Sequence, residues 1–178
     1  MEYYTLKFAG LERKLPIVSL TPKIRVASFN LLGDAKFVQV SAKEISKILN
    51  KIEFDCLVGP EVKVVPVLQE LSKILGHERY VIFRKNITGY MVEPKKSKML
   101  PGLYLDGRDA TYLKGKKVVV IDDVVTTGKT LRAVGFFLKE IGANVVYNIS
   151  VFTQAGAEND LPPNFAGLST LPVFLKEK

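Results

Sequence analysis

A fourteen-residue run at positions 118–131 constrains the fold of this chain more tightly than any other part of the sequence. It reads VVVIDDVVTTGKTL: four apolar residues, two adjacent aspartates, a turn rich in threonine and glycine, and the beginning of a helical pattern. The apolar residues predict a buried strand closed by Asp122 and Asp123, and a helix is predicted over residues 129–141, ending at Gly142. A buried strand joined to a helix by a polar turn is the repeating unit of parallel α/β sheets.

The turn at residues 126–130 has the chemistry of an anion site, since it offers backbone N–H groups, threonine hydroxyls and a helix N-terminus. Lys129 at the start of that helix opposes the helix dipole, and a bound phosphate would reverse the sign of this effect. The neighbouring aspartates can hold hydroxyl groups or a metal ion. Ordinary capping of a helix by threonine or aspartate is the simpler interpretation. A ligand that carries both a phosphate and a sugar diol would satisfy both halves of the run.

A nucleotide-binding P-loop is a competing interpretation of this turn, because Gly128, Lys129 and Thr130 match the end of its pattern. That pattern also requires a glycine five positions before Gly128, and the residue there is Asp123. The sequence therefore excludes a P-loop at this position.

The rest of the sequence alternates strand and helix patterns. Residues 1–40 contain short apolar runs broken by proline and glycine, which indicates irregular strands and turns. Beyond them we predict a helix at 41–52 with Ser41 and Glu44 as a capping box, a strand at 54–59, a helix at 64–75 closed by Gly76, strands at 80–83 and 144–152, and a strand and turn at 103–107 that return to the sheet. The fold class is therefore α/β, with a mostly parallel central sheet flanked by helices.

Composition indicates a single domain over residues 1–178. Hydrophobic residues make up 47% of the chain, but no apolar stretch approaches the ~20 residues needed to cross a bilayer, and the N-terminus shows no secretion signal. Cys56 is the only cysteine, which excludes an internal disulfide and fits a reducing cytoplasm, and its apolar neighbours predict a buried thiol. The net charge of +8 would suit nucleic acid or small polyphosphates equally well.

Three turns of the predicted sheet carry distinctive residues: 59–64, 84–90 and 122–130. In an open parallel sheet the ligand crevice lies outside the carboxyl ends of the strands. Each of these turns follows a predicted strand, so we expect all three to meet at one rim of the sheet. This convergence supports a binding site more strongly than any single motif does.

Residues 118–131 resemble the signature of the type I phosphoribosyltransferases, which bind 5-phosphoribosyl-1-pyrophosphate. The resemblance implies that Asp122 and Asp123 are catalytic and hold the ribose 2- and 3-hydroxyls, directly or through water bound to a Mg²⁺ cofactor. It also implies that the following turn encloses the 5-phosphate. The ribose and 5-phosphate contacts are then expected from Asp122, Asp123, Val124, Val125, Thr126, Thr127, Gly128, Lys129 and Thr130.

Two further segments resemble the pyrophosphate site of the same family. The run GPEVK at 59–63 is similar to its pyrophosphate loop, which often contains an unusual peptide conformation. Family members often carry a small residue or glycine after the glutamate, and Val62 and Val64 depart from this with stiff, β-branched side chains. Arg84 and Lys85 resemble an Arg-Lys pair of purine phosphoribosyltransferases, where cations neutralise the leaving group. The expected pyrophosphate-binding residues are Glu61, Val62, Lys63, Arg84 and Lys85.

The resemblance also divides the chain into functional segments. These are a small hood over the base at about 1–40, a core at about 41–154 that includes a mobile flap at about 86–116, and a C-terminal segment at 155–178. Phe29 in the hood is a candidate for stacking on the base, although an aromatic side chain in a strand is more often part of the core. The flap would exclude water, and Glu93 is its candidate proton acceptor.

The implied activity is Mg²⁺-dependent transfer of the 5-phosphoribosyl group to a purine base, in purine salvage. The layout resembles the adenine-type branch, and Thr126 stands where enzymes for 6-oxopurines commonly have an aspartate. Hypoxanthine, guanine, xanthine and orotate stay open as the base, and so does a regulatory protein that binds phosphoribosyl pyrophosphate without turnover. The expected partners are phosphoribosyl pyrophosphate, a nucleobase and a second copy in a homodimer, with no stable nucleic acid partner and no membrane.

Overall fold

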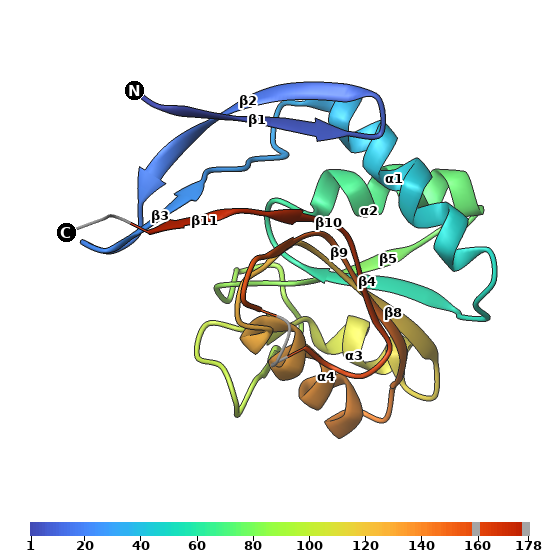
Figure 1. Cartoon of the computed structure of the whole chain (residues 1–178). Coiled ribbons are helices and arrows are strands. Elements are labelled where there is room, and N and C mark those ends of the chain that lie inside the picture. Colours follow the sequence, from blue (N-terminus) through green and yellow to red (C-terminus); the bar gives the residue numbers. More distant parts are fainter. Residues whose placement is uncertain (158–160, 176–178) are drawn as a thin grey trace.

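A five-stranded parallel sheet forms the centre of the computed structural model, which describes residues 1–157 and 161–175 (Figure 1). Its strands are β4 (Cys56–Pro60), β5 (Tyr80–Phe83), β8 (Lys117–Val125), β9 (Asn144–Gln154) and β10 (Phe165–Leu171), in the spatial order β10-β9-β8-β4-β5. Every neighbouring pair is parallel. The predicted α/β fold with a mostly parallel central sheet is therefore confirmed, and β10 is an edge strand that the sequence did not predict.

Helices cover both faces of this sheet: α1 (Ala35–Leu49) and α2 (Val65–Leu75) lie on one side, α3 (Gly107–Leu113) and α4 (Lys129–Glu140) on the other (Figure 1). The apolar run of β8 serves both faces, because successive side chains of a strand point to opposite sides. Val119 and Ile121 pack in the core with α1 and α2, whereas Val118 and Val120 pack in the core with α3 and α4. All four residues are fully buried, as expected for a strand covered on both faces.

The first helix begins earlier than the sequence predicted. Asp34 caps α1 by accepting a hydrogen bond from the backbone N–H of Phe37 (3.0 Å). The predicted capping box is wrong, because Ser41 and Glu44 both lie inside the helix and Ser41 is fully buried there. The helix also ends at Leu49 instead of residue 52. Its apolar face already includes Phe37, so the periodic pattern extends back across the predicted start.

The N-terminal residues form a second sheet on the α1 and α2 side of the molecule (Figure 1). Its strands are β1 (Tyr3–Phe8), β2 (Leu11–Ser19), β3 (Ile24–Ala27) and β11 (Val173–Leu175), which pair in the antiparallel order β1-β2-β3-β11. The strands and turns predicted for this region are confirmed, but the contribution of β11 was not foreseen. Arg13 in β2 donates hydrogen bonds to both carboxylate oxygens of Asp34 (2.6 and 3.1 Å), which ties this sheet to the start of α1.

The segment between β5 and β8 is more regular than the sequence predicted. β6 (Lys95–Lys96) and β7 (Tyr104–Leu105) form a two-stranded antiparallel sheet, so the strand predicted at 103–107 does not join the five-stranded sheet. Leu105 and Leu113 are fully buried in the core around α3 and α4. The second part of the predicted flap is therefore packed into the body of the protein, and the flap-like part is limited to residues 86–102, hereafter the flap.

The remaining predicted elements lie close to their expected positions. β4, α2, β5, α4 and β9 begin and end within two residues of the predicted boundaries. The predicted burial of Cys56 is also confirmed, and burial raises the pKa of its thiol to about 11. Within residues 1–157 and 161–175, none of the helices has both the length and the apolar character that a membrane crossing requires.

Candidate functional site

The three turns that the sequence singled out lie at the carboxyl ends of neighbouring strands. Residues 61–64 follow β4, residues 84–85 follow β5, and residues 126–128 follow β8. β4 is paired with both β5 and β8, and all three strands run in the same direction. The predicted convergence at one rim of the sheet is therefore confirmed, at the place where open parallel sheets bind their ligands.

The turn after β8 is shaped for an anion. Gly128 has a left-handed backbone (φ 65°) at the N-cap of α4, which turns the chain from the strand into the helix. Residues 124–131 and Asp122 line a small cavity of about 30 Å³. Lys129, the first residue of α4, is exposed, and its ammonium has no ion-pair partner in the described part of the chain. A helix N-terminus with an unpaired cation beside it suits a phosphate group.

Asp122 and Asp123 lie inside β8, because its ladder to β9 continues as far as Val125. The prediction that the acid pair closes the strand is therefore wrong. The two residues are only 8% and 9% exposed, and the backbone N–H of Asp123 donates to Oδ1 of Asp122 (2.8 Å). Oδ2 of Asp123 is buried and has no hydrogen-bond partner among the described residues. The ammonium of Lys63 lies 3.6 Å from this oxygen.

The two aspartates do not ionise independently. Burial holds the pKa of Asp122 well above its ordinary value, and the negative charge of Asp123 raises it further. Lys63 acts in the opposite direction. The pair therefore carries one full negative charge more readily than two, unless a neighbour supplies additional positive charge.

Glu61 connects the turn after β4 to the end of β5. Its Oε2 lies 2.7 Å from Nε of Arg84, and its Oε1 accepts a hydrogen bond from the backbone N–H of Lys85 (2.5 Å). Arg84 also exchanges two backbone hydrogen bonds with Tyr104 (2.8 Å each). The guanidinium carbon of Arg84 lies 5.6 Å from the centre of the Tyr90 ring, within the range of a cation–π contact. Arg84 is therefore held on three sides.

The other two residues of the predicted pyrophosphate loop face outward. The peptide bond between Glu61 and Val62 is cis, which is an unusual conformation of the kind expected in this loop. Val62 is 52% exposed, and the side chain of Lys63 is 48% exposed. Both are thus accessible to a ligand at the rim, and their contact with pyrophosphate stays a prediction.

Two residues predicted to act on the base lie elsewhere. Phe29 is buried, and its ring centre lies 5.0 Å from that of Phe37 and 4.6 Å from that of Phe152. It belongs to the aromatic core between the N-terminal sheet, α1 and β9, which corrects the expectation of a ring free to stack on a base. Glu93 lies in the flap with a side chain that is 82% exposed, 3.9 Å from Lys95. Its role as a proton acceptor stays a prediction.

An anchor at the base of the flap was not predicted from the sequence. The carboxylate of Asp106 binds the guanidinium of Arg108 (2.7 Å) and accepts from its backbone N–H (2.9 Å) as the N-cap of α3. The Arg108 guanidinium holds the pKa of Asp106 well below its usual range. Arg108 also donates to the backbone carbonyl of Tyr90 in the flap (3.1 Å). An aspartate before a short helical pattern is an N-cap signal that would have revealed α3.

The described residues of the site supply only part of the coordination shell that a metal ion needs. Among the described residues, no group of three or more Asp, Glu, His or Cys side chains is arranged to hold one. Mg²⁺ keeps several waters and is usually bound through one or two carboxylates together with phosphate oxygens of a ligand. The acid pair fits that mode, since the buried Oδ2 of Asp123 is an acceptor without a hydrogen-bond partner in the described chain.

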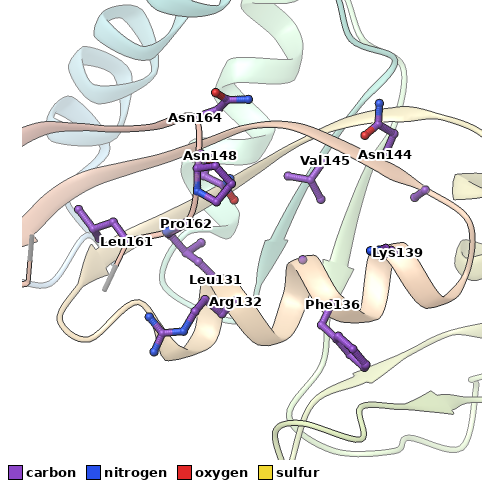
Figure 2. Close-up of a pocket in the computed structure, with 13 residues that line it drawn as sticks. Leu131, Arg132, Phe136, Lys139, Asn144, Val145, Asn148, Leu161, Pro162 and Asn164 are labelled. Atoms are coloured by element: carbon purple, nitrogen blue, oxygen red, sulfur yellow. The ribbon is translucent and has the colours of Figure 1, made fainter. Parts of the chain in front are cut away.

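A separate groove of about 590 Å³ lies between α4, β9 and the connection that leads into β10 (Figure 2). Its walls include Leu131, Val145 and Leu161. Leu131 also borders the small cavity of the turn after β8, but neither the acid pair nor the predicted pyrophosphate residues line the groove. The chemistry predicted from the sequence therefore belongs to the polar rim of the sheet rather than to this mostly apolar groove.

The known proteins to which this chain is similar are phosphoribosyltransferases. The family model described as the phosphoribosyl transferase domain matches residues 30–164. The orotate phosphoribosyltransferase of Thermotoga maritima is 31% identical over 152 residues, which cover 84% of this chain and 71% of that protein. The adenine phosphoribosyltransferase of Methanococcus maripaludis is 31% identical over 146 residues, which cover 76% and 81%. A crystal structure of adenine phosphoribosyltransferase from Rhodothermus marinus has a TM-score of 0.65 at 18% identity, covering 94% of this chain and 93% of that one.

Proposed function

The chain belongs to the phosphoribosyltransferase family, and we propose that it transfers the 5-phosphoribosyl group from phosphoribosyl pyrophosphate to a purine base, with adenine as the preferred substrate. The products would be a nucleoside monophosphate and pyrophosphate, as in purine salvage. Family membership makes the chain an enzyme of nucleotide metabolism that acts on a nucleobase. The proposal adds the donor, the base and the residues that carry the reaction.

The Lys63–Asp123 ion pair is the observation that supports this proposal most directly. It brings the turn after β4, which is assigned to pyrophosphate, next to the acid pair of the neighbouring strand β8, which is assigned to ribose. In the donor, pyrophosphate is bonded to C1 of the ribose, the 2- and 3-hydroxyls come next, and the 5-phosphate lies at the far end. The order Lys63, acid pair and turn 126–130 at the rim follows the order of these groups.

The proposed reaction is a displacement at C1. A ring nitrogen of the base forms a bond to C1 while the C1–O bond to pyrophosphate breaks, and pyrophosphate leaves with the electron pair. Positive charge develops on the sugar beside Asp123, whose carboxylate stabilises it. Negative charge develops on the leaving group, which Lys63, Arg84 and Lys85 would bind. Bound Mg²⁺ would neutralise further charge on the pyrophosphate. The proton from the base nitrogen is assigned to Glu93.

The flap supports a reaction from which water must be excluded. Its exposed apolar side chains are Ile87, Tyr90, Val92 and Met99, each between 48% and 61% exposed. Apolar surface gains free energy when it is removed from water, at about 25 cal/mol per Å². Closing the flap over a bound donor would bury these side chains and protect the activated C1 from hydrolysis.

Adenine is proposed on two grounds. Thr126 stands where enzymes for 6-oxopurines commonly have an aspartate, and the M. maripaludis relative is named as an adenine enzyme. Orotate is the second candidate, because the T. maritima relative, named as an orotate enzyme, is equally identical over slightly more of the chain.

A panel of bases tests both the activity and the preference. The chain would be incubated with phosphoribosyl pyrophosphate, Mg²⁺ and, in turn, adenine, hypoxanthine, guanine, xanthine and orotate, and pyrophosphate release would be followed. We expect the highest kcat/KM with adenine. A higher value with another base would overturn the preference but not the activity. Tight binding of phosphoribosyl pyrophosphate without release of pyrophosphate for any base would overturn the proposed activity and favour a regulatory protein.

We further propose a homodimer in a reducing, cytoplasmic setting, which rests on the family resemblance and on the single buried Cys56. Sedimentation equilibrium of the purified protein should give twice the mass of one chain. A mass equal to one chain across the micromolar range would contradict the dimer.

A further inference from the structure

Glu61 has the wrong charge for the role that the family resemblance gave it. It is the only acidic side chain among the predicted pyrophosphate-binding residues, and it is mostly buried, with a side chain 20% exposed. A carboxylate beside pyrophosphate would repel it, because both groups are negatively charged and close together. Direct contact with the leaving group is therefore an unfavourable use of this residue.

The contacts of Glu61 point instead to the end of β5. The backbone N–H of Glu61 donates to the carbonyl of Phe83 (2.8 Å), which continues the parallel register of Pro60 with Phe83. Glu61 is thereby placed alongside Arg84, the next residue of the neighbouring strand. One carboxylate oxygen then reaches Nε of Arg84 (2.7 Å), and the other accepts from the backbone N–H of Lys85 (2.5 Å).

These contacts leave the rest of both cations free. The terminal nitrogens of Arg84 make no hydrogen bond to a described residue, and the ammonium of Lys85 has no ion-pair partner in the described part of the chain. The Nε edge of the guanidinium is occupied by Glu61, and Tyr90 lies 5.6 Å from the guanidinium carbon. The groups best suited to bind a phosphate in a bidentate manner are thus the ones that remain available.

We propose that Glu61 is a positioning residue of the pyrophosphate site: it fixes the Arg84 guanidinium and the Lys85 backbone so that their free donors face the leaving group. This inference rests on the proposed function and deepens it. A cation held in place by a neighbouring carboxylate loses less conformational entropy on binding its ligand. The charge of Glu61 is neutralised by Arg84, so its repulsion of pyrophosphate is largely offset.

The direction in which one substitution changes the affinity for pyrophosphate distinguishes this role from simple charge repulsion. Replacing Glu61 with glutamine removes a negative charge from an anion site, so Coulomb repulsion alone predicts tighter binding of pyrophosphate. The positioning role predicts weaker binding. We expect Glu61→Gln to raise the Kd of pyrophosphate, measured by isothermal titration calorimetry with Mg²⁺ present, by about tenfold, since the ion pair that holds the Arg84 guanidinium is lost. Glu61→Ala should raise it further, because the contact with Lys85 is lost as well.

Glu61→Gln should have the opposite effect on pyrophosphate binding when Arg84 is replaced by an uncharged residue. In an Arg84→Met background, which keeps an aliphatic side chain near Tyr90, Glu61 has no guanidinium to hold and only repels the ligand. Glu61→Gln should therefore lower the Kd of pyrophosphate in that background. Glu70→Gln is the matched control. The side chain of Glu70 on α2 is 25% exposed and pairs with Lys73, as Glu61 pairs with Arg84. The Glu70→Gln variant should bind pyrophosphate with the same Kd as the parent.

A second readout follows the tether without any ligand. The Nε proton of Arg84 should exchange with water faster in Glu61→Gln than in the parent, as seen by NMR. Tighter pyrophosphate binding by Glu61→Gln in the parent background, equal effects in both backgrounds, or an unchanged exchange rate would each overturn the positioning role. Failure of the parent protein itself to bind pyrophosphate would overturn the proposed function together with this inference.

Discussion

Asp122 and Asp123 place two carboxyl groups side by side in a buried part of the protein. We expect Asp122→Asn combined with Asp123→Asn to abolish turnover, with a loss on the order of 10³-fold or more, because an amide cannot stabilise positive charge on the ribose. The fold should survive, since the β8–β9 ladder is made by the backbone. Pyrophosphate release and far-ultraviolet circular dichroism would measure the two effects, with the exposed Glu78→Gln as a control. Retained turnover in the double variant would refute the site assignment.

The raised pKa of Asp122 has a consequence for stability. The folded protein keeps a proton on this carboxyl group at pH values where the unfolded chain, with an ordinary aspartate pKa of about 3.9, has lost it. The folded state then binds more protons than the unfolded state, so this group lowers the stability progressively as the pH rises above about 4. Asp122→Asn removes the penalty.

We therefore expect Asp122→Asn to melt at a higher temperature than the parent at pH 7 to 8, by a few degrees for about 1 kcal/mol. The difference should shrink towards zero as the pH falls to 4. Thermal denaturation across this range would measure it, with Glu78→Gln showing no such trend. A difference independent of pH, or one that grows in acid, would contradict the assigned pKa shift.

At the residue scale, local patterns were the most informative part of the sequence. The acid pair and the turn at 126–130 could be identified because their residues are contiguous. The tether from Glu61 to Arg84 could not, because it depends on the register of β4 against β5. Phe29 illustrates a second limit of local patterns. The sequence identifies an aromatic residue in an apolar segment, but only the packing shows that its ring is buried against Phe37 and Phe152.

At the element scale, Gly59 in β4 is a position beside β8 where a side chain has no room. A Cβ added there would lie 2.6 Å from the backbone oxygen of Ile121 in β8 and 2.9 Å from side-chain atoms of Val64 and Leu68. Because the closest atom is backbone, the strands or the following turn must shift. We expect Gly59→Ala to cost about 1–3 kcal/mol of unfolding free energy and to weaken pyrophosphate binding through the displaced turn.

Gly135 in α4 provides the matched control. A Cβ at this position has no atom within 4 Å beyond its own helix, and alanine favours a helix over glycine by roughly 0.5–1 kcal/mol. Gly135→Ala should therefore stabilise the protein, so the same substitution has opposite signs at the two positions. Urea denaturation would measure both. Equal effects would show that the approach of β4 to β8 is not as close as the structure has it.

The boundaries of elements were predicted well where local chemistry decides them. Gly76 closes α2 in a left-handed conformation, as its position in the pattern indicated. The start of α1 was misjudged because Ser41 and Glu44 match a capping box, whereas the true cap is Asp34. β8 was predicted too short because two aspartates look like a strand end. Pairing with β9 keeps both aspartates in the ladder instead, where burial raises the pKa of Asp122.

At the scale of the whole molecule, the alternation of strands and helices was enough to predict the parallel sheet and the rim at which three turns meet. The sequence did not reveal that residues 173–175 return to the N-terminal sheet as β11 and pair with β3, because the partners lie far apart in the chain. β11 is short, and nothing in a three-residue apolar segment indicates which strand it will join. The N-terminal sheet is thus built from both ends of the described chain.

This arrangement predicts that the C-terminal strand stabilises the N-terminal sheet selectively. Truncation after residue 172 removes the pairing of Val173 with Val26 and the contact of Phe174 with Tyr4, whereas truncation after residue 175 keeps both. We expect the shorter chain to show faster hydrogen exchange in β3, with β8 still protected, because the five-stranded sheet does not depend on β11. Mass spectrometry of exchanged peptides would measure this.

The same pair of truncations separates the two halves of the proposed site. If the N-terminal sheet covers the base, the chain ending at 172 should show a raised KM for the base, while pyrophosphate binding at the rim of β4, β5 and β8 stays within about twofold of the parent. The chain ending at 175 should match the parent in both. A loss of pyrophosphate binding in proportion to the loss of base binding would show that β11 supports the whole fold, because the two sheets would then unfold together.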